Sequence, residues 1–234
     1  MTAILKRELK AYFSSPIGYI YLATFYLFSG FYFFGSCLIY NYAGLESVFS
    51  ALFTITIILI PILTMRLLSE DKKHKTDQAL LTAPISLMSL VMGKYLAALL
   101  VFVMGISITM VFALVLAAFT VPDWAVIFGN FIGLFLMGAA LISICMFISA
   151  LTENQVIAAV GGFAAGFGLI LIDALSSLIN VEFLRKFVEG MSFMTRYNQF
   201  TVGLLDFSSI VFFLSVIAVF VFFTVRVFEK KRWA

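Results

Sequence analysis

Long apolar runs separated by short polar stretches dominate this sequence. Six of the runs reach the length of about 20 residues that a helix needs to cross a bilayer core about 30 Å thick. They occupy residues 17–40, 48–68, 88–119, 124–151, 156–179 and 210–228. The pattern predicts an all-α polytopic membrane protein in which residues 1–234 form a single transmembrane domain.

Two further segments are amphipathic at helical spacing. Residues 1–13 place Ile4, Leu9 and Phe13 near one helix face and basic side chains around the other. Such a helix is typical of one that lies on membrane lipid, with its charges toward anionic head groups. Residues 180–209 scatter charges among large apolar side chains, which predicts a segment that lies on or dips into the opposite interface.

The longest hydrophilic stretch covers residues 69–86, between the second and third runs. Thr76 is a suitable N-cap for a short helix, and Pro84 ends it. The helix would display Leu80 and Leu81 to the cytoplasm, where exposed apolar residues indicate docking into a groove on a partner. A plain charged loop whose leucines rest on the membrane surface explains the residues equally well.

Composition supports the membrane assignment, and the placement of charge sets the orientation. The chain is 63% hydrophobic and 12% charged, and its net charge of +3 is no sign of a nucleic-acid partner in a membrane protein. With a cytoplasmic N-terminus, twelve Lys and Arg residues lie on or near the inside and three lie outside. The positive-inside rule therefore places both termini and residues 69–86 in the cytoplasm of a cell (inner) membrane protein.

The sequence offers no means of catalysis or of binding a cofactor. Gly93-Lys94 has no glycine five residues earlier and precedes a tyrosine, so the phosphate-binding GxxxxGK[ST] loop is missing. His74 is the only histidine, and no metal site is expected. At the rise of about 1.5 Å per residue of a helix, Asp173 would lie near the outer end of the fifth span. Carriers driven by an ion gradient usually keep ionisable residues deep in the membrane, so this position disfavours such a carrier. If this non-enzymatic chain performs energetically uphill work, the energy comes from another subunit or from an ion gradient.

Small residues repeat at four-residue spacing in two of the spans. The fourth span contains Gly129 and Gly133, and the fifth contains Gly162 and Gly166. This spacing allows helix backbones to approach closely in lipid. We expect packing inside one subunit, ahead of a dimer seam or a translocation path.

Several motifs together resemble the type-2 ABC exporter permeases, and within them the gliding-motility GldF-type branch. The motifs are Ser14-Ser15-Pro16-Ile17-Gly18-Tyr19, Met65-Arg66, Ser69-Glu70-Asp71-Lys72-Lys73, Thr76, Leu80-Leu81-Thr82, Pro84-Ile85-Ser86, Gly93-Lys94-Tyr95, and Tyr197, Phe200, Gly203 and Asp206 with the apolar run that follows. Lys75 stands where that family usually has glycine, and Val202 where it has a common arginine.

The resemblance implies a role for each segment. Residues 1–13 would be the elbow helix, and residues 180–209 an outer gate of re-entrant helices that includes Tyr197, Phe200, Gly203 and Asp206. Residues 69–86 would be the cytoplasmic coupling segment that contacts an ATPase. Its site residues would be Glu70, Asp71, Lys72, Lys73, Thr76, Leu80, Leu81 and Pro84.

The resemblance also implies partners and a function. The chain would pair with a second permease copy or a homologue and with two ATPase subunits that bind ATP and Mg, and it would export an amphipathic or lipid-linked cargo. One alternative is a subunit that transmits motion to a large extracytoplasmic accessory protein without moving cargo. A second is a channel or carrier that needs no ATPase.

Overall fold

The computed structural model describes residues 1–40, 44–73, 75, 86–176, 188–204 and 206–233, and every regular element in these ranges is a helix. Six helical segments are long and apolar enough to cross a membrane, which confirms the predicted all-α polytopic fold. They consist of α2 (Pro16–Phe33) with η1 (Phe34–Ile39), α3 (Glu46–Thr64), α6 (Leu87–Ile106) with α7 (Ile108–Ala117), α8 (Trp124–Leu151), α9 (Gln155–Ser176) and α12 (Phe207–Trp233).

The shorter helices include α1 (Thr2–Ser14), α11 (Phe193–Thr201) and α4 (Ser69–Lys73), which forms the end of the second membrane-length segment. Helix α1 occupies the predicted amphipathic segment, and Ser15 alone separates it from α2. Pro16 suits the first position of α2, because the backbone N–H that proline lacks would have no partner there. The chain therefore begins its first span directly after α1.

Three spans differ from the sequence prediction. The sixth helix, α12, begins three residues before the predicted start at residue 210 and continues five residues past the predicted end at residue 228. The second helix ends at Thr64, short of the predicted boundary at residue 68, and α4 begins only at Ser69. The third is broken at Ser107. Near this break the carbonyl oxygen of Met104 accepts hydroxyl hydrogen bonds from Tyr26 at 2.8 Å and Ser107 at 2.7 Å. These hydroxyls compete with the backbone N–H that would otherwise continue the helix.

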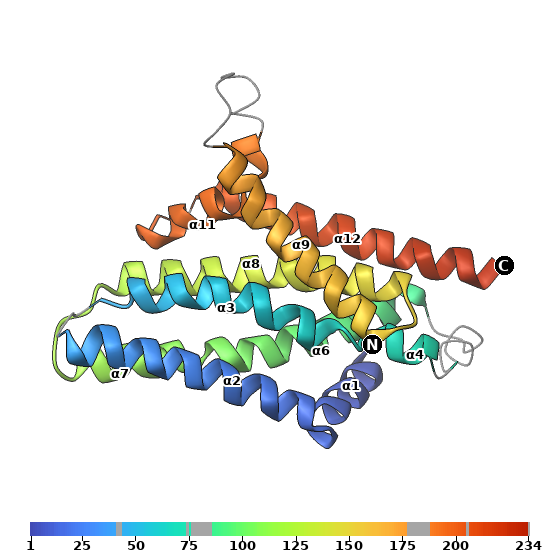
Figure 1. The fold of residues 1–234 in the computed structure, drawn as a ribbon, viewed down its shortest axis with the longest axis horizontal. Coiled ribbons are helices and arrows are strands. Elements are labelled where there is room, and N and C mark those ends of the chain that lie inside the picture. Colours follow the sequence, from blue (N-terminus) through green and yellow to red (C-terminus); the bar gives the residue numbers. More distant parts are fainter. Residues whose placement is uncertain (41–43, 74, 76–85, 177–187, 205, 234) are drawn as a thin grey trace.

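Helix α8 is the centre of the bundle. In the most apolar window of α8, 72% of residues are buried, against 17% in α9 and in α12. It packs against α3, α6, α9, α11 and α12, and Figure 1 shows α3 running alongside it. Helix α9 crosses the bundle obliquely.

The two ends of the bundle carry different short helices. Figure 1 shows α4 at the same end as the N-terminus and the C-terminus, while the connection from α7 to α8 lies at the opposite end. Helix α1 packs on α6 at the α4 end, and α11 packs on α8 toward the other end. One continuous cluster of buried side chains extends from Tyr12 in α1 to Phe228 in α12.

Candidate functional site

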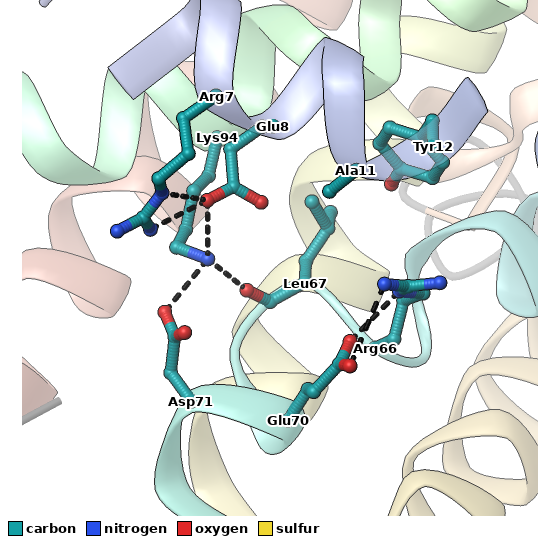
Figure 2. A pocket seen from close by; sticks show the side chains of 9 residues that line it. All are labelled: Arg7, Glu8, Ala11, Tyr12, Arg66, Leu67, Glu70, Asp71 and Lys94. Carbon is teal, nitrogen blue, oxygen red and sulfur yellow. Dashed lines mark hydrogen bonds and ion pairs between the residues drawn. The ribbon is translucent and has the colours of Figure 1, made fainter. Parts of the chain in front are cut away.

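Lys94 is the centre of a buried ionic cluster at the α4 end of the bundle. It lies about 10 Å along α6 from the first residue of that helix, and its side chain is 2% exposed. The ammonium contacts Asp71 Oδ2 at 2.7 Å and Glu8 Oε1 at 3.2 Å, and donates to the carbonyl oxygen of Leu67 at 2.6 Å (Figure 2). Lys94 therefore joins α6 to α1, to α4 and to the turn between α3 and α4.

The sequence of α6 explains why this cation needs two carboxylates. Side chains on a helix point toward its N-terminus, so the lysine reaches back toward the end of the bundle. Burial removes water from the ammonium, which is costly for an unpaired charge. Asp71 and Glu8 offset this loss.

Close packing of α1 on α6 brings Glu8 to the lysine. A Cβ at Gly93 would lie 2.9 Å from Cγ2 of Ile4, so only glycine allows the two helices to approach this closely. Glu8 also accepts a hydrogen bond from Arg7 Nη2 at 2.6 Å. The carboxylate is thus shared between a half-exposed arginine and the buried lysine.

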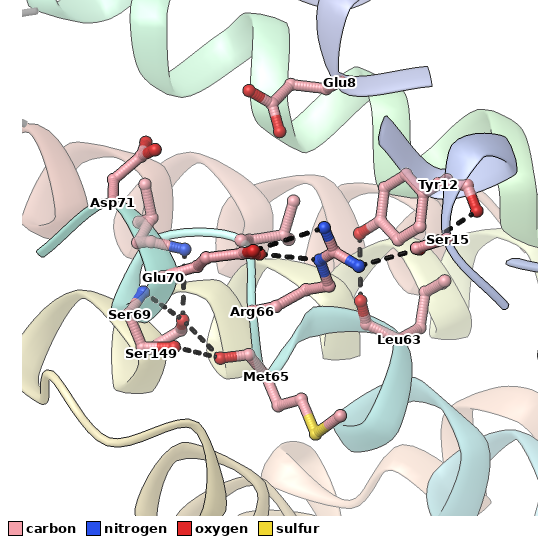
Figure 3. Close-up of polar contacts among 12 residues, drawn as sticks. Glu8, Tyr12, Ser15, Leu63, Met65, Arg66, Ser69, Glu70, Asp71 and Ser149 are labelled. Carbon is pink, nitrogen blue, oxygen red and sulfur yellow. Dashed lines mark hydrogen bonds and ion pairs between the residues drawn. The ribbon is translucent and has the colours of Figure 1, made fainter. Parts of the chain in front are cut away.

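Arg66 makes a second ionic contact beside the first. Its guanidinium pairs with Glu70 Oε2 at 2.8 Å and donates to Oγ of Ser15 at 2.8 Å (Figure 3). Nearby, the Tyr12 hydroxyl donates to the carbonyl oxygen of Leu63 at 2.9 Å. Burial raises the pKa of the Tyr12 phenol well above its ordinary value, so this side chain remains a neutral donor.

Neutral contacts attach α4 to the end of α8. Oγ of Ser149 accepts hydrogen bonds from the backbone N–H groups of Leu68 and Ser69, both at 3.2 Å, and donates to the carbonyl oxygen of Met65 at 3.1 Å (Figure 3). Lys72 Nζ donates to the carbonyl oxygen of Ala150. Helix α4 is therefore held on one side by ion pairs and on the other by backbone hydrogen bonds.

A cavity of about 280 Å³ opens between these groups. Its lining residues are Arg7, Glu8, Ala11, Tyr12, Arg66, Leu67, Glu70, Asp71 and Lys94. Three of these are cations and three are carboxylates, so their charges cancel. Each charged side chain has an oppositely charged partner within the chain, and the pairs made by Lys94 join α6 to α1 and to α4.

The predicted coupling residues fall into two groups. Glu70, Asp71, Lys72 and Lys73 form most of α4, and both carboxylates bind cations of this same chain. Thr76, Leu80, Leu81 and Pro84 lie outside the described residues. Lys75 lies between these two groups and has a φ of +55°, in the left-handed region that glycine adopts most readily. Glycine is the usual residue at this position in the family that the sequence resembles.

The predicted outer-gate residues gather around α11. Tyr197 and Phe200 are buried, and Gly203 has a φ of +76° just after the helix. Asp206 Oδ2 accepts hydrogen bonds from the N–H and the Oγ of Ser209, both at 2.9 Å. These bonds lower the pKa of the Asp206 carboxyl below its ordinary value, because they favour its charged form.

The two predicted glycine pairs lie at contacts between helices of this chain. A Cβ at Gly129 would lie 2.7 Å from the carbonyl oxygen of Phe200, and one at Gly133 would lie 2.8 Å from Cβ of Phe200. Gly162 and Gly166 face α3, where a Cβ would lie 2.9 Å from Pro61 and 2.7 Å from Ile57 respectively. The first pair thus seats α11 on α8, and the second seats α9 on α3.

Sequence reasoning did not select Lys94 or Glu8 as site residues. Gly93-Lys94 served only to exclude a nucleotide-binding loop and as part of a family motif, and Glu8 was one charge on an amphipathic face. The available signal was a single charged residue inside an apolar span, because such residues in membrane helices usually have a functional partner.

Comparison with protein-family models identifies a family for this chain. A family model described as ABC-2 family transporter protein matches residues 28–233, nearly the whole chain. A search of curated proteins found no match. The matched range includes α4 and Lys94 at one end of the bundle and α11 toward the other, whereas α1 with Glu8 precedes it.

Proposed function

Because this chain belongs to the ABC-2 transporter family and is a membrane permease subunit of an ABC transporter, we propose that it couples ATP hydrolysis by a separate ATPase to export. The cargo would be an amphipathic or lipid-linked molecule that leaves the cytoplasm or the inner leaflet. Residues 69–86 would receive the movement of the ATPase.

The observation that carries this proposal is the anchoring of α4. This helix is only five residues long, yet it contacts α6 and α1 through Lys94 and the end of α8 through Ser149. A displacement applied next to α4 would therefore reach three helices at once. A loop that merely rested on the membrane surface would need no such set of contacts.

The surface of α2 supports an apolar or amphipathic cargo. Tyr19, Leu27 and Phe31 are each more than half exposed along this helix. A cavity of about 350 Å³ lies between α2 and α3, with Phe28, Tyr32 and Ile58 among its lining residues. We propose that this face, together with a second permease copy or a homologue, lines the path.

The remaining partners follow from the same proposal. Two ATPase subunits would bind ATP and Mg, since this sequence lacks a phosphate-binding loop. The resemblance to the GldF-type branch adds a large extracytoplasmic accessory protein. Both termini and residues 69–86 would face the cytoplasm, and α11 the outer side.

The test is a substitution in the coupling segment. We expect Leu81→Asp to abolish ATP turnover that depends on the permease, because a charge would prevent apolar docking, while membrane insertion stays unchanged. The assay is ATP hydrolysis by the purified permease–ATPase complex in nanodiscs. Val121→Asp is the matched control, since Val121 is 98% exposed at the opposite end of the bundle. Unaltered turnover in Leu81→Asp would contradict the docking role.

A second measurement separates export from transmission of motion. Proteoliposomes that contain the complex and a fluorescent lipid should move that lipid between leaflets when ATP is added. If ATP is hydrolysed without any lipid movement while an accessory protein remains bound, the transmission alternative is favoured. If the purified permease never retains an ATPase, the alternative that remains is a channel or carrier that needs none.

A further inference from the structure

Lys94 connects elements that lie far apart in the sequence. Glu8 is in α1, Asp71 is in α4, and Lys94 itself is in α6, so the three charges come from three helices. Helix α1 is followed by the exposed first span, whereas α4 is the first part of the coupling segment, residues 69–86. A single ammonium therefore lies between the element that would receive movement and the helix that precedes the first span.

The distances rank the three contacts of this ammonium. Lys94 Nζ is 2.6 Å from the Leu67 carbonyl oxygen and 2.7 Å from Asp71, but 3.2 Å from Glu8. The lysine is thus bound more closely to the α4 region than to α1. Glu8 in turn has Arg7 as a second cation. A small shift of α4 would carry the ammonium with it and change its contact with Glu8 first.

Burial makes this connection hard to stretch. The Lys94 side chain is 2% exposed, and those of Glu8 and Asp71 are 13% and 17% exposed. A buried cation that loses its carboxylates without gaining water is strongly destabilised. Electrostatic attraction also falls slowly with distance, so it persists through displacements that would end a packing contact.

We propose that Lys94 is the positioning residue through which movement of α4 is passed to α1, a step that rests on the proposed function. Displacement of α4 moves Asp71 and the Leu67 carbonyl, the ammonium follows them, and Glu8 draws α1 along. Ser149 passes the same displacement to α8 by a separate, neutral route. Loss of Lys94 therefore removes the buried ionic connection from α4 to α1, and leaves the contact of Arg66 with Ser15 and the attachment to α8 in place.

The experiment reads the response of α1 to nucleotide directly. Lys6, an exposed residue of α1, is changed to cysteine and labelled with an environment-sensitive fluorophore in a chain that lacks Cys37 and Cys145. The labelled permease–ATPase complex in nanodiscs is measured without nucleotide and with ATP plus vanadate. We expect a spectral shift in the parent complex. Lys94→Met should reduce that shift at least about fivefold, the lower end of typical couplings between sites.

Two further variants make the result interpretable. Glu8→Leu removes the contact of Lys94 with α1, together with the Arg7–Glu8 pair inside α1, and leaves Lys94 with Asp71 and Leu67, so it tests the same step if Lys94→Met fails to assemble. It should also lose the shift while the ATPase remains bound. Lys10→Met removes an exposed lysine of α1 and should keep the full shift.

The possible outcomes test the role of Lys94 separately from the proposed permease function. A full spectral shift in either Lys94→Met or Glu8→Leu, with the ATPase bound, overturns the role of Lys94 and leaves the permease function standing. A parent complex that binds and hydrolyses ATP without any shift overturns the movement of α1. An ATPase that fails to bind the parent permease overturns the proposed function itself.

Discussion

At the α4 end of the bundle, buried ion pairs join the helices, whereas at the other end the contact of α11 with α8 is apolar and closely packed. Lys94, Asp71 and Glu8 connect three helices through ion pairs at 2.7 and 3.2 Å. At the other end, Phe200 lies directly on Gly129 and Gly133 of α8, where no Cβ would fit. The same bundle thus uses two kinds of attachment.

The physics of these attachments differs with displacement. Attraction between opposite charges falls gradually as they separate. The flexible four-carbon stem of a lysine also allows its ammonium to follow a partner that moves. A packing contact loses a quarter to a half of its energy over a gap of about 0.5–1 Å. The α4 end is therefore suited to relative movement, and the seat of α11 on α8 is suited to a fixed shape.

This comparison predicts that the α11 end is sensitive to added volume. Gly133→Val would place a Cβ 2.8 Å from Cβ of Phe200, an atom fixed to the backbone. We expect the free energy of unfolding to fall by about 1–3 kcal/mol, the usual range for overpacking. Thermal unfolding in detergent measures the change.

The matched control is Gly168→Val in α9, where no atom lies within 4 Å of the added Cβ. It should be close to neutral, because valine has a somewhat higher helix propensity than glycine and meets no neighbour there. Equal losses from the two variants would show that the α11 end is no more tightly packed than an open helix face.

The sequence predicts the spans well because length and hydropathy alone define them. The fourth span was expected over residues 124–151, and α8 has these bounds. The break at Ser107 was missed, since it depends on the Tyr26 hydroxyl of another helix. The early end of α3 was missed as well, although Pro61 lies only three residues before it.

The contacts of the candidate site are harder to predict from the sequence than the spans are. Its central contact joins Lys94 to Glu8, which are 86 positions apart, and no local pattern indicates that pairing. Glu70 and Asp71 were expected to face a partner because the family resemblance places them in the coupling segment. Glu70 instead pairs with Arg66, four residues before it, and Asp71 pairs with Lys94 of α6, a contact that only the packing of α4 and α6 reveals.

Two buried tyrosines allow the ends to be compared by one chemical change. Tyr12→Phe removes a hydrogen bond of 2.9 Å to the Leu63 carbonyl oxygen, and we expect a loss of about 1 kcal/mol. Tyr197→Phe removes contacts of 3.4 Å to Asn130 Oδ1 and 3.5 Å to the Phe49 carbonyl oxygen, at the limit for a hydrogen bond. Its effect on the unfolding midpoint should be smaller. A larger loss from Tyr197→Phe would reverse the distinction between the ends.

The smallest expected effect concerns the one described carboxylate of the α11 end whose pKa is lowered. Hydrogen bonds from Ser209 favour the charged form of Asp206, so its folded pKa lies below the unfolded value of about 3.9. The resulting stabilisation is present above that unfolded value and is lost as the pH falls through the folded pKa. Asp206→Asn keeps an acceptor for the N–H of Ser209 but carries no charge. The difference in unfolding midpoint between the two proteins should be constant from pH 7 to about pH 5 and shrink toward pH 3. A difference that did not change with pH would mean that the charge of Asp206 contributes nothing to this end of the bundle.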